Sequence, residues 1–207
     1  MEAKQLEFPT WGGKRKGAGR KANGPLRRVS HKKRPEHATR FPVHAVLRTR
    51  EDVPRLRRSE IFREVRQALT DGAERAGFRV VHLSVQGNHI HLVVEAADKR
   101  ALSRGMQGLA IRIARAVNRA AGRKGRVFSD HYFARELRTP TEVRRAVRYV
   151  LDNFIRHARL ETPQTDSRAA SLIAPRTWLL ATGWLRSRAG PLPVAYWSVH
   201  VEEPPAD

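Results

Sequence analysis

Two histidines one residue apart, at the start of an apolar run, are the most chemically suggestive feature of this 207-residue sequence. They are His89 and His91, separated by Ile90. In an extended strand successive side chains point to opposite faces, so both imidazoles project to one side while Ile90 points into a core. Two imidazoles on one sheet face can hold a divalent cation if a third ligand arrives from elsewhere, because neutral imidazole binds metals.

A polar row on a later helix offers the rest of the chemistry. A helix is predicted over 139–157, and at about 100° per residue its apolar stripe is separate from one polar row. That row consists of Arg145, Tyr149, Asn153 and Arg156. A tyrosine at the edge of an apolar stripe is often only an anchoring residue. Here the neighbouring arginines can hold a phosphate, and the amide oxygen of Asn153 can supply the third metal ligand.

Hydrophobic periodicity predicts the elements that must position these groups. Strands are predicted over 40–50, 78–86, 89–95 and 127–137, and helices over 59–76, 99–121 and 139–157. In the second strand Val81, Leu83 and Val85 are assigned to one face, and Gly87-Asn88 predicts a tight turn into the histidine strand. With right-handed crossovers this order predicts an α+β, ferredoxin-like fold. It has a four-stranded antiparallel sheet with the helices on one face and the other face free for a ligand.

The charge of the chain predicts a polyanionic partner. The sequence has 41 Lys and Arg against 20 Asp and Glu, a net charge of +21. Nucleic acid is the simplest such partner and a membrane surface is the alternative. No apolar run is long enough to span a bilayer, and we expect a DNA partner and no membrane. The absence of cysteine excludes disulfides, thiol nucleophiles and cysteine-ligated zinc. We expect a cytoplasmic protein that is nucleoid-associated when bound to DNA.

Composition divides the chain into three parts. Residues 1–40 interleave glycine with basic side chains and are predicted to be a flexible DNA-binding arm; a solvated tail is the alternative. The candidate DNA contacts of this arm are Lys14, Arg15, Lys16, Arg20 and Lys21. Residues 41–158 are predicted to be the catalytic domain, and 159–207 a linker and docking tail. Trp178 and Trp184 suggest a short helix that docks on the core, with a lid over the site as the less favoured interpretation.

Several of these stretches resemble the REP-associated branch of the tyrosine transposases, within the His-hydrophobic-His single-strand endonuclease superfamily. The resemblance covers residues 10–158 and is carried by residues 11–21, 88–91, 101–108, 125–128 and 148–153. It implies that His89 and His91 are metal ligands, that Tyr149 is the nucleophile and that Asn153 is the polar group one turn beyond it. Arg145 and Arg156 are candidate DNA contacts on the same helix.

The resemblance also implies an activity. The chain would use Mg²⁺ or Mn²⁺ to cleave and rejoin single-stranded DNA at hairpin sequences through a 5′-phosphotyrosine intermediate, in DNA transposition and recombination. Two alternatives stay open: a domesticated, inactive DNA-binding protein, and an RNA-binding module of similar fold. The RNA module is disfavoured because residues 81–85 and 90–94 contain no aromatic side chain for base stacking. Whether the protein is a monomer or a homodimer is left open by the sequence.

Overall fold

The computed structural model describes residues 35–161 and 172–187, and the side chains of 35–153 and 172–187. Its strands are β1 (Val43–Arg48), β2 (Glu74–Arg75), β3 (Phe78–Val85), β4 (His89–Ala96) and β5 (Phe133–Glu136). Its helices are α1 (Ser59–Asp71), α2 (Lys99–Ala120), α3 (Pro140–Glu161), α4 (Trp178–Ala181) and a short 3₁₀ helix, η2 (Gly183–Arg186). None of the helices in the described ranges is long and apolar enough to cross a membrane.

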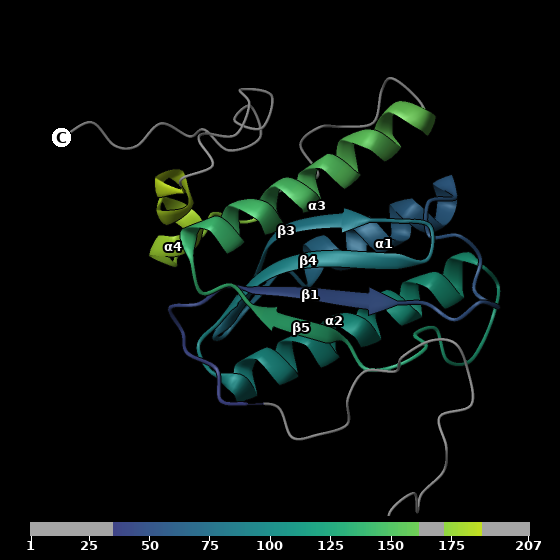
Figure 1. The fold of residues 1–207 in the computed structure, drawn as a ribbon. Helices are drawn as coiled ribbons and strands as arrows, with labels where there is room; N and C mark the ends of the chain where they lie inside the picture. Colours follow the sequence, from purple (N-terminus) through teal and green to yellow (C-terminus); the bar gives the residue numbers. More distant parts are fainter. Residues whose placement is uncertain (1–34, 162–171, 188–207) are drawn as a thin grey trace, which may run out of the picture.

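The strands form one antiparallel sheet with the order β2-β3-β4-β1-β5 (Figure 1). The α+β class is confirmed, although the sheet has five strands where four were predicted. The extra strand, β2, pairs with the start of β3 across a turn in which Gly77 has a φ of 70°. Glycine adopts this left-handed conformation without a steric penalty. The helix predicted over 59–76 therefore ends at Asp71, and the chain turns back to make a hairpin.

The last strand of the sheet is shorter than the sequence predicted. In place of a strand over 127–137 the ladder with β1 covers only the four residues of β5, and Phe128 forms an isolated bridge to Thr49. Between them the Asp130 carboxylate accepts a hydrogen bond from the backbone N–H of His131, at 2.8 Å. Such local side-chain bonds compete with the strand ladder, which explains the interruption.

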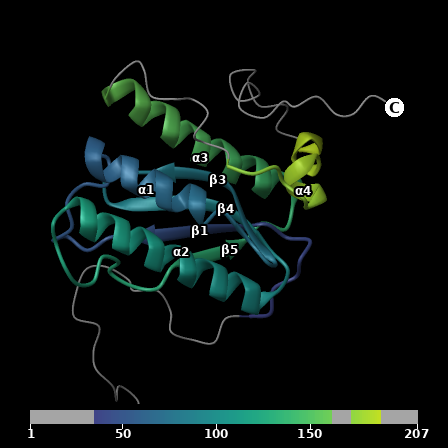
Figure 2. The same cartoon turned by 180° about the vertical axis from the view of Figure 1, so that it is seen from behind.

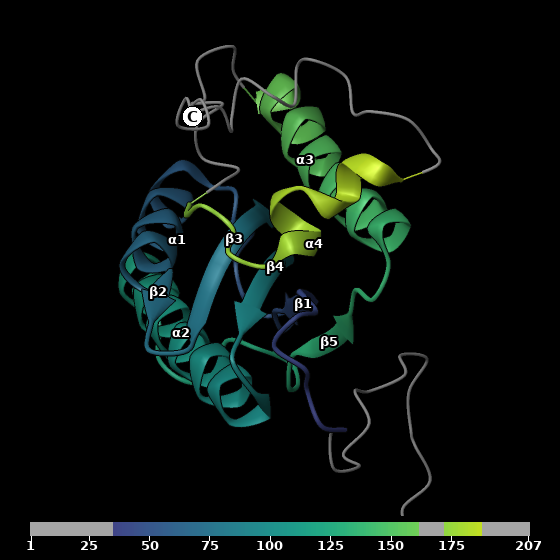
Figure 3. The same cartoon turned by 90° about the vertical axis from the view of Figure 1, so that its left-hand side faces the viewer.

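Helices cover both faces of the sheet (Figure 3). Helices α1 and α2 pack side by side on one face, as Figure 2 shows, and enclose the larger apolar core. On α2, a β-carbon at Gly105 would lie 2.2 Å from the ring of Phe78, so glycine is what allows this close approach. Helix α3 packs on the opposite face, mainly over β3 and β4, with α4 beside it. This corrects the predicted arrangement, in which that face was free; only its β1 and β5 side is left uncovered by α3 (Figure 1).

A β-bulge in β3 turns one of its apolar side chains towards α3. The register passes from Val80 opposite Val94 to His82 opposite Val93, which leaves Val81 as the extra residue. Val81 is fully buried under α3, whereas Leu83 and Val85 belong to the core beneath α1 and α2. The prediction that Val81, Leu83 and Val85 share one face is therefore wrong, because a bulge changes the alternation of the strand.

A buried carboxylate attaches the carboxy-terminal segment to the sheet. Glu95 on β4 is 4% exposed and accepts hydrogen bonds from the backbone N–H groups of Arg176 and Thr177, at 2.7 to 3.0 Å, and from the Thr177 hydroxyl at 2.8 Å. The backbone N–H of Leu172 also donates to the carbonyl of Val81. These bonds position α4 against α3, at the opposite end of β4 from the two histidines.

Candidate active site

Strand β4 holds His89 and His91 on the face that α3 covers. The Gly87-Asn88 turn joins β3 to β4 as predicted, and the N–H of Gln86 donates to the carbonyl of His89 at 2.8 Å. The two imidazole centroids lie 4.7 Å apart, with the rings nearly perpendicular. His91 is 5% exposed and His89 is half-buried, so the pair runs from the interior to the surface.

Helix α3 brings Tyr149 to this pair. The helix begins with a capping box: the N–H of Glu142 donates to the Thr139 hydroxyl, and the Glu142 carboxylate accepts from the N–H of Thr139. Its apolar stripe, which includes Val147 and Val150, packs on β3 and β4. Tyr149 lies at the edge of that stripe with half its surface exposed, and its ring centroid is 5.0 Å from that of His91. The structure thus brings the predicted nucleophile into contact with a predicted metal ligand.

A third histidine, which the sequence reasoning did not identify, joins the site from β1. His44 Nε2 lies 3.2 Å from His91 Nδ1, and the two rings stack with their centroids 5.4 Å apart. The His44 centroid is also 6.2 Å from that of Tyr149. The available signal was the alternation of β1, which places His44 on the polar face of the strand. Its proximity to His91 depends on β1 pairing with β4, which no local pattern reveals.

The surroundings of His91 keep its ring neutral. Burial, followed by the neighbouring His89 and His44, lowers the pKa of His91 to about 3. Burial also lowers the pKa of His44, with a further contribution from the positive charge of Arg135. At neutral pH both rings therefore carry one proton, and each keeps a nitrogen lone pair.

The hydrogen bonds of the two β4 histidines are compatible with metal binding through Nε2. His89 Nδ1 lies 2.7 Å from the Asn88 side-chain oxygen, which accepts only, so the proton of a neutral His89 resides on Nδ1. His91 Nδ1 is bonded to His44, while His91 Nε2 is buried without a hydrogen-bond partner in the part of the chain that the structure describes. A metal ligand whose other ring nitrogen is held by a polar group is the usual arrangement in proteins. The bonding of His91 therefore leaves its Nε2 available as a metal ligand, with the His89 ring next to it.

The third ligand is not fixed by histidine or a carboxylate. Within residues 35–153 and 172–187, no group of three His, Asp or Glu side chains is arranged to hold a metal ion. Asn153 is half-buried one turn after Tyr149 on α3 and remains the candidate from the sequence. An amide oxygen is a weaker donor than a carboxylate, so such a site would keep positions open for water or a phosphate.

Two exposed arginines lie on α3 and β1, the elements that carry Tyr149 and His44. Arg145 is exposed one turn before Tyr149 on α3, and Arg48 is exposed on β1, opposite His89. Arg48 was missed by the sequence reasoning. The other predicted DNA contacts cannot be placed: Lys14, Arg15, Lys16, Arg20 and Lys21 lie outside the described residues, and the side chain of Arg156 lies outside the described side chains.

Comparison with known proteins adds a family and two similar folds. Residues 37–153 match the family model described as "Transposase IS200 like". No curated protein sequence matches the chain. One similar solved structure is a REP-associated tyrosine transposase bound to a REP hairpin, at 15% identity and a TM-score of 0.49, covering 62% of this chain and 74% of that one. Another is a suspected transposase from Deinococcus radiodurans R1, at 16% identity and a TM-score of 0.41, covering 61% of this chain and 98% of that one.

Proposed function

The chain belongs to the IS200-like transposase family, and on this basis we propose that it cuts and rejoins single-stranded DNA at hairpin sequences with Tyr149 as the nucleophile. The observation that carries the proposal is the contact between α3 and β4. It places the Tyr149 ring 5.0 Å from His91, which is itself 4.7 Å from His89. The phenol can supply the nucleophile, the two imidazoles can be metal ligands, and the nearby arginines can neutralise phosphate charge, so the cleavage needs no external energy source.

In the first step the Tyr149 oxygen forms a bond to phosphorus while the bond from phosphorus to the 3′ oxygen breaks. The tyrosine hydroxyl gives up its proton, and the leaving 3′ oxygen takes one up. The products are a 5′-phosphotyrosine and a free 3′-hydroxyl. Rejoining reverses the step with the 3′-hydroxyl of a strand end, so the covalent bond conserves the energy of the one that was cut.

The residues around Tyr149 have two further proposed roles, metal binding and phosphate contact. A divalent cation, Mg²⁺ or Mn²⁺, held by His89, His91 and Asn153 would polarise the scissile phosphate and neutralise its charge. Imidazole ligands favour Mn²⁺, since Mg²⁺ prefers an all-oxygen shell. Arg145 is exposed beside Tyr149, where its guanidinium can contact a neighbouring phosphate.

The proposed domains follow the same division. Residues 41–158 form the catalytic domain, the basic residues of 1–40 bind the DNA backbone together with Arg145 and Arg156, and 159–207 form a linker and docking tail. The charge of +21 supports a broad electrostatic contribution to DNA affinity.

A covalent adduct tests the proposal. The full-length protein is incubated with a labelled hairpin oligonucleotide and Mn²⁺, and a denaturing gel separates protein-linked from free DNA. We expect an adduct with the wild type and none with Tyr149→Phe, which loses only the hydroxyl and should keep its unfolding temperature. Tyr132→Phe is the matched control, because the Tyr132 ring packs against the α1–α2 core, and it should form the adduct.

Three results would contradict the proposal in different ways. An adduct that persists in Tyr149→Phe and disappears in Tyr132→Phe would move the nucleophile to the other tyrosine. Tight DNA binding by the wild type with no adduct under any divalent metal would favour the inactive DNA-binding protein. Tighter binding to RNA than to DNA of the same sequence, again without an adduct, would favour the RNA-binding module.

A further inference from the structure

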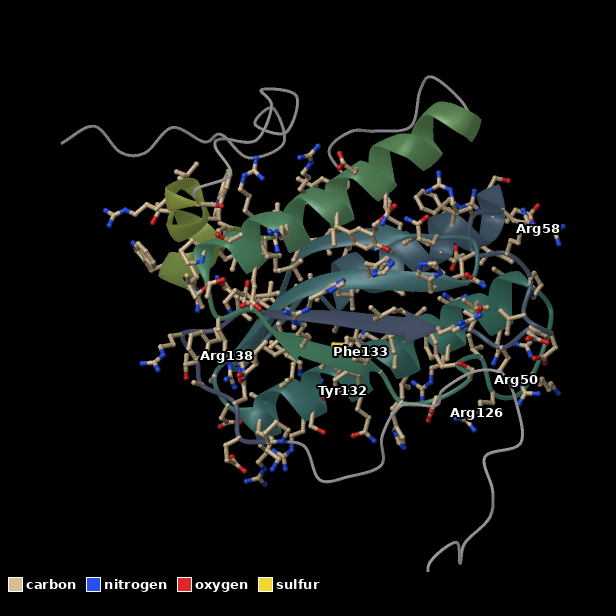
Figure 4. The ribbon with its side chains drawn as sticks, viewed as in Figure 1. Arg50, Arg58, Arg126, Tyr132, Phe133 and Arg138 are labelled. Carbon is tan, nitrogen blue, oxygen red and sulfur yellow. The ribbon has the colours of Figure 1, made fainter. Side chains whose placement is uncertain are left out.

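Phe133 is an exposed aromatic side chain on the open part of the sheet, labelled in Figure 4. It begins the edge strand β5, and half of its surface is exposed to solvent. Its neighbours Tyr132 and Ala134 pack against the core beneath α1 and α2, whereas Phe133 belongs to neither apolar cluster. By the alternation of the strand, its ring points to the opposite face, the one that carries Tyr149.

The register of the sheet places Phe133 in the same cross-strand row as His91. Phe133 is opposite Val46 on β1, and Val46 is opposite His91 on β4. Directly paired residues of antiparallel strands point to the same face. At ~4.8 Å per strand, the backbones at the two ends of this row are about 10 Å apart. The exposed ring therefore lies beside the proposed cleavage site, with one strand between.

Cationic side chains border this open strip. In the next row Arg135 is opposite His44; its side chain is 63% exposed and also pairs with Glu142 at 2.7 Å. On the other side Arg48 is opposite His89 and exposed, with no carboxylate partner among the residues the structure describes. An aromatic face between two guanidinium groups matches the alternation of base and phosphate in a single strand.

We propose that Phe133 is a stacking platform for an unpaired base of the DNA strand, next to the phosphate that reaches Tyr149. The proposal rests on the proposed function and adds a subsite to it: the strand crosses β1 and β5, a base stacks on Phe133, and its phosphates lie near Arg48 and Arg135. Stacking on an aromatic ring tolerates every base. The subsite thus fixes the position of the strand and does not read its sequence.

A second copy of the chain is the competing occupant of this edge. Two β5 strands pairing in antiparallel fashion would bring Arg135 of each copy close to the other, and Arg138 also lies beside the edge (Figure 4). Like charges opposite one another destabilise such pairing, and a four-residue strand offers few ladder bonds. The charge of the edge therefore favours a nucleic-acid strand over self-association.

Binding to DNA with and without bases tests the subsite separately from catalysis. Full-length protein in EDTA is titrated with labelled oligothymidylate and with an oligonucleotide of the same length made entirely of abasic sugar-phosphate. Phe133→Ala should weaken binding to oligothymidylate about 5- to 150-fold, the range equivalent to one lost base stack. The affinity of Phe133→Ala for the abasic strand should be unchanged. Phe133→Trp should restore the wild-type difference in affinity between oligothymidylate and the abasic strand. Ile111→Ala is the matched control, an exposed apolar side chain on α2 that should alter neither affinity.

Several results would overturn the subsite. Equal losses on both strands, or no loss on either, would show that Phe133 does not stack on a base, as would a wild type that binds neither strand. A dimeric wild type that becomes monomeric in Phe133→Ala would assign the ring to a second copy. A lowered unfolding temperature with unchanged DNA affinity would assign it to packing by other parts of this chain. The binding titration is done in EDTA and so does not depend on cleavage. A missing adduct in the Mn²⁺ assay would therefore refute only the proposed function. If Phe133→Ala kept the wild-type difference in affinity between oligothymidylate and the abasic strand, only the subsite would be refuted.

Discussion

Acidification should destabilise the metal-free protein through His91 before most carboxylates titrate. The folded state lowers the pKa of His91 to about 3, chiefly through burial, whereas an unfolded histidine titrates near 6.5. Between these values the unfolded state binds a proton that the folded state does not. The unfolding free energy is therefore independent of this group above pH ~6.5 and falls as the pH is lowered towards 3.

The size of the effect follows from the one proton involved. One proton gives a slope of at most ~1.4 kcal/mol per pH unit, or ~2 kcal/mol between pH 6.5 and 5. His89 and Tyr149, which contact the His91 ring, are partly exposed, and solvent screening at these side chains reduces the free-energy penalty for charging His91. We therefore expect a loss of about 1 kcal/mol over this range.

Urea unfolding in EDTA at a series of pH values measures this loss. His91→Asn is the informative variant, since an amide nitrogen can take the place of Nδ1 beside His44 but does not titrate. Its unfolding free energy should change less than that of the wild type between pH 6.5 and 5, with the remaining slope coming partly from His44. His131→Asn, the same change at an exposed histidine outside the group of His44, His89 and His91, is the matched control. Parallel curves for wild type and His91→Asn would refute the assignment of the slope to His91.

Three further predictions concern other parts of the molecule. His44→Ala should weaken Mn²⁺ binding about 10- to 100-fold, measured by electron paramagnetic resonance, because His91 loses the group that orients its ring; unchanged affinity would contradict this role. Glu95→Ala should lower the unfolding free energy measured with urea by about 2–4 kcal/mol, because the N–H groups of Arg176 and Thr177 lose a charged acceptor. The carboxy-terminal segment should then become sensitive to protease. A segment that stays resistant would show that the apolar contacts of α4 are enough to hold it on the core. Deleting residues 1–34 should flatten the salt dependence of DNA binding, since log K falls with the number of neutralised phosphates; an unchanged slope would assign the phosphate contacts to the remaining chain.

The parts of the site that were predictable from the sequence are those set by local periodicity. The two-residue period of a strand puts His89 and His91 on one face, and the 3.6-residue period of a helix puts Tyr149 beside the apolar stripe of α3. Both follow from backbone geometry alone and hold in the structure. The roles of these residues, and of Asn153, remain predictions that the adduct and metal-binding experiments test.

The parts that were not predictable depend on which strands are neighbours. His44 and Phe133 lie far from His91 in sequence, and β1 and β5 join β4 only through the order of the sheet. The bulge at Val81 depends on the pairing of β3 with β4, and it turns towards α3 a side chain that simple alternation assigned to the other core. The sequence reasoning did not predict that α3 covers one face of the sheet, because this packing also depends on contacts between elements that are distant in sequence. Local patterns specify which side of its own element a residue occupies and carry no information about register between elements.

Strand β4 connects the chemistry of the site to the stability of the fold. Its Ile90, Leu92 and Val94 side chains are completely buried in the core beneath α1 and α2, so the strand cannot shift without exposing them. A shift of one residue would also exchange its two faces and remove both histidines from α3. The side chains of β4 that face α3 are therefore fixed in position as well, with the two histidines at one end of the strand and Glu95, which binds the carboxy-terminal segment, at the other. Because α3 packs on this strand through a separate apolar stripe, Tyr149 is held against His91 by two cores, and its side chain stays half-exposed to solvent.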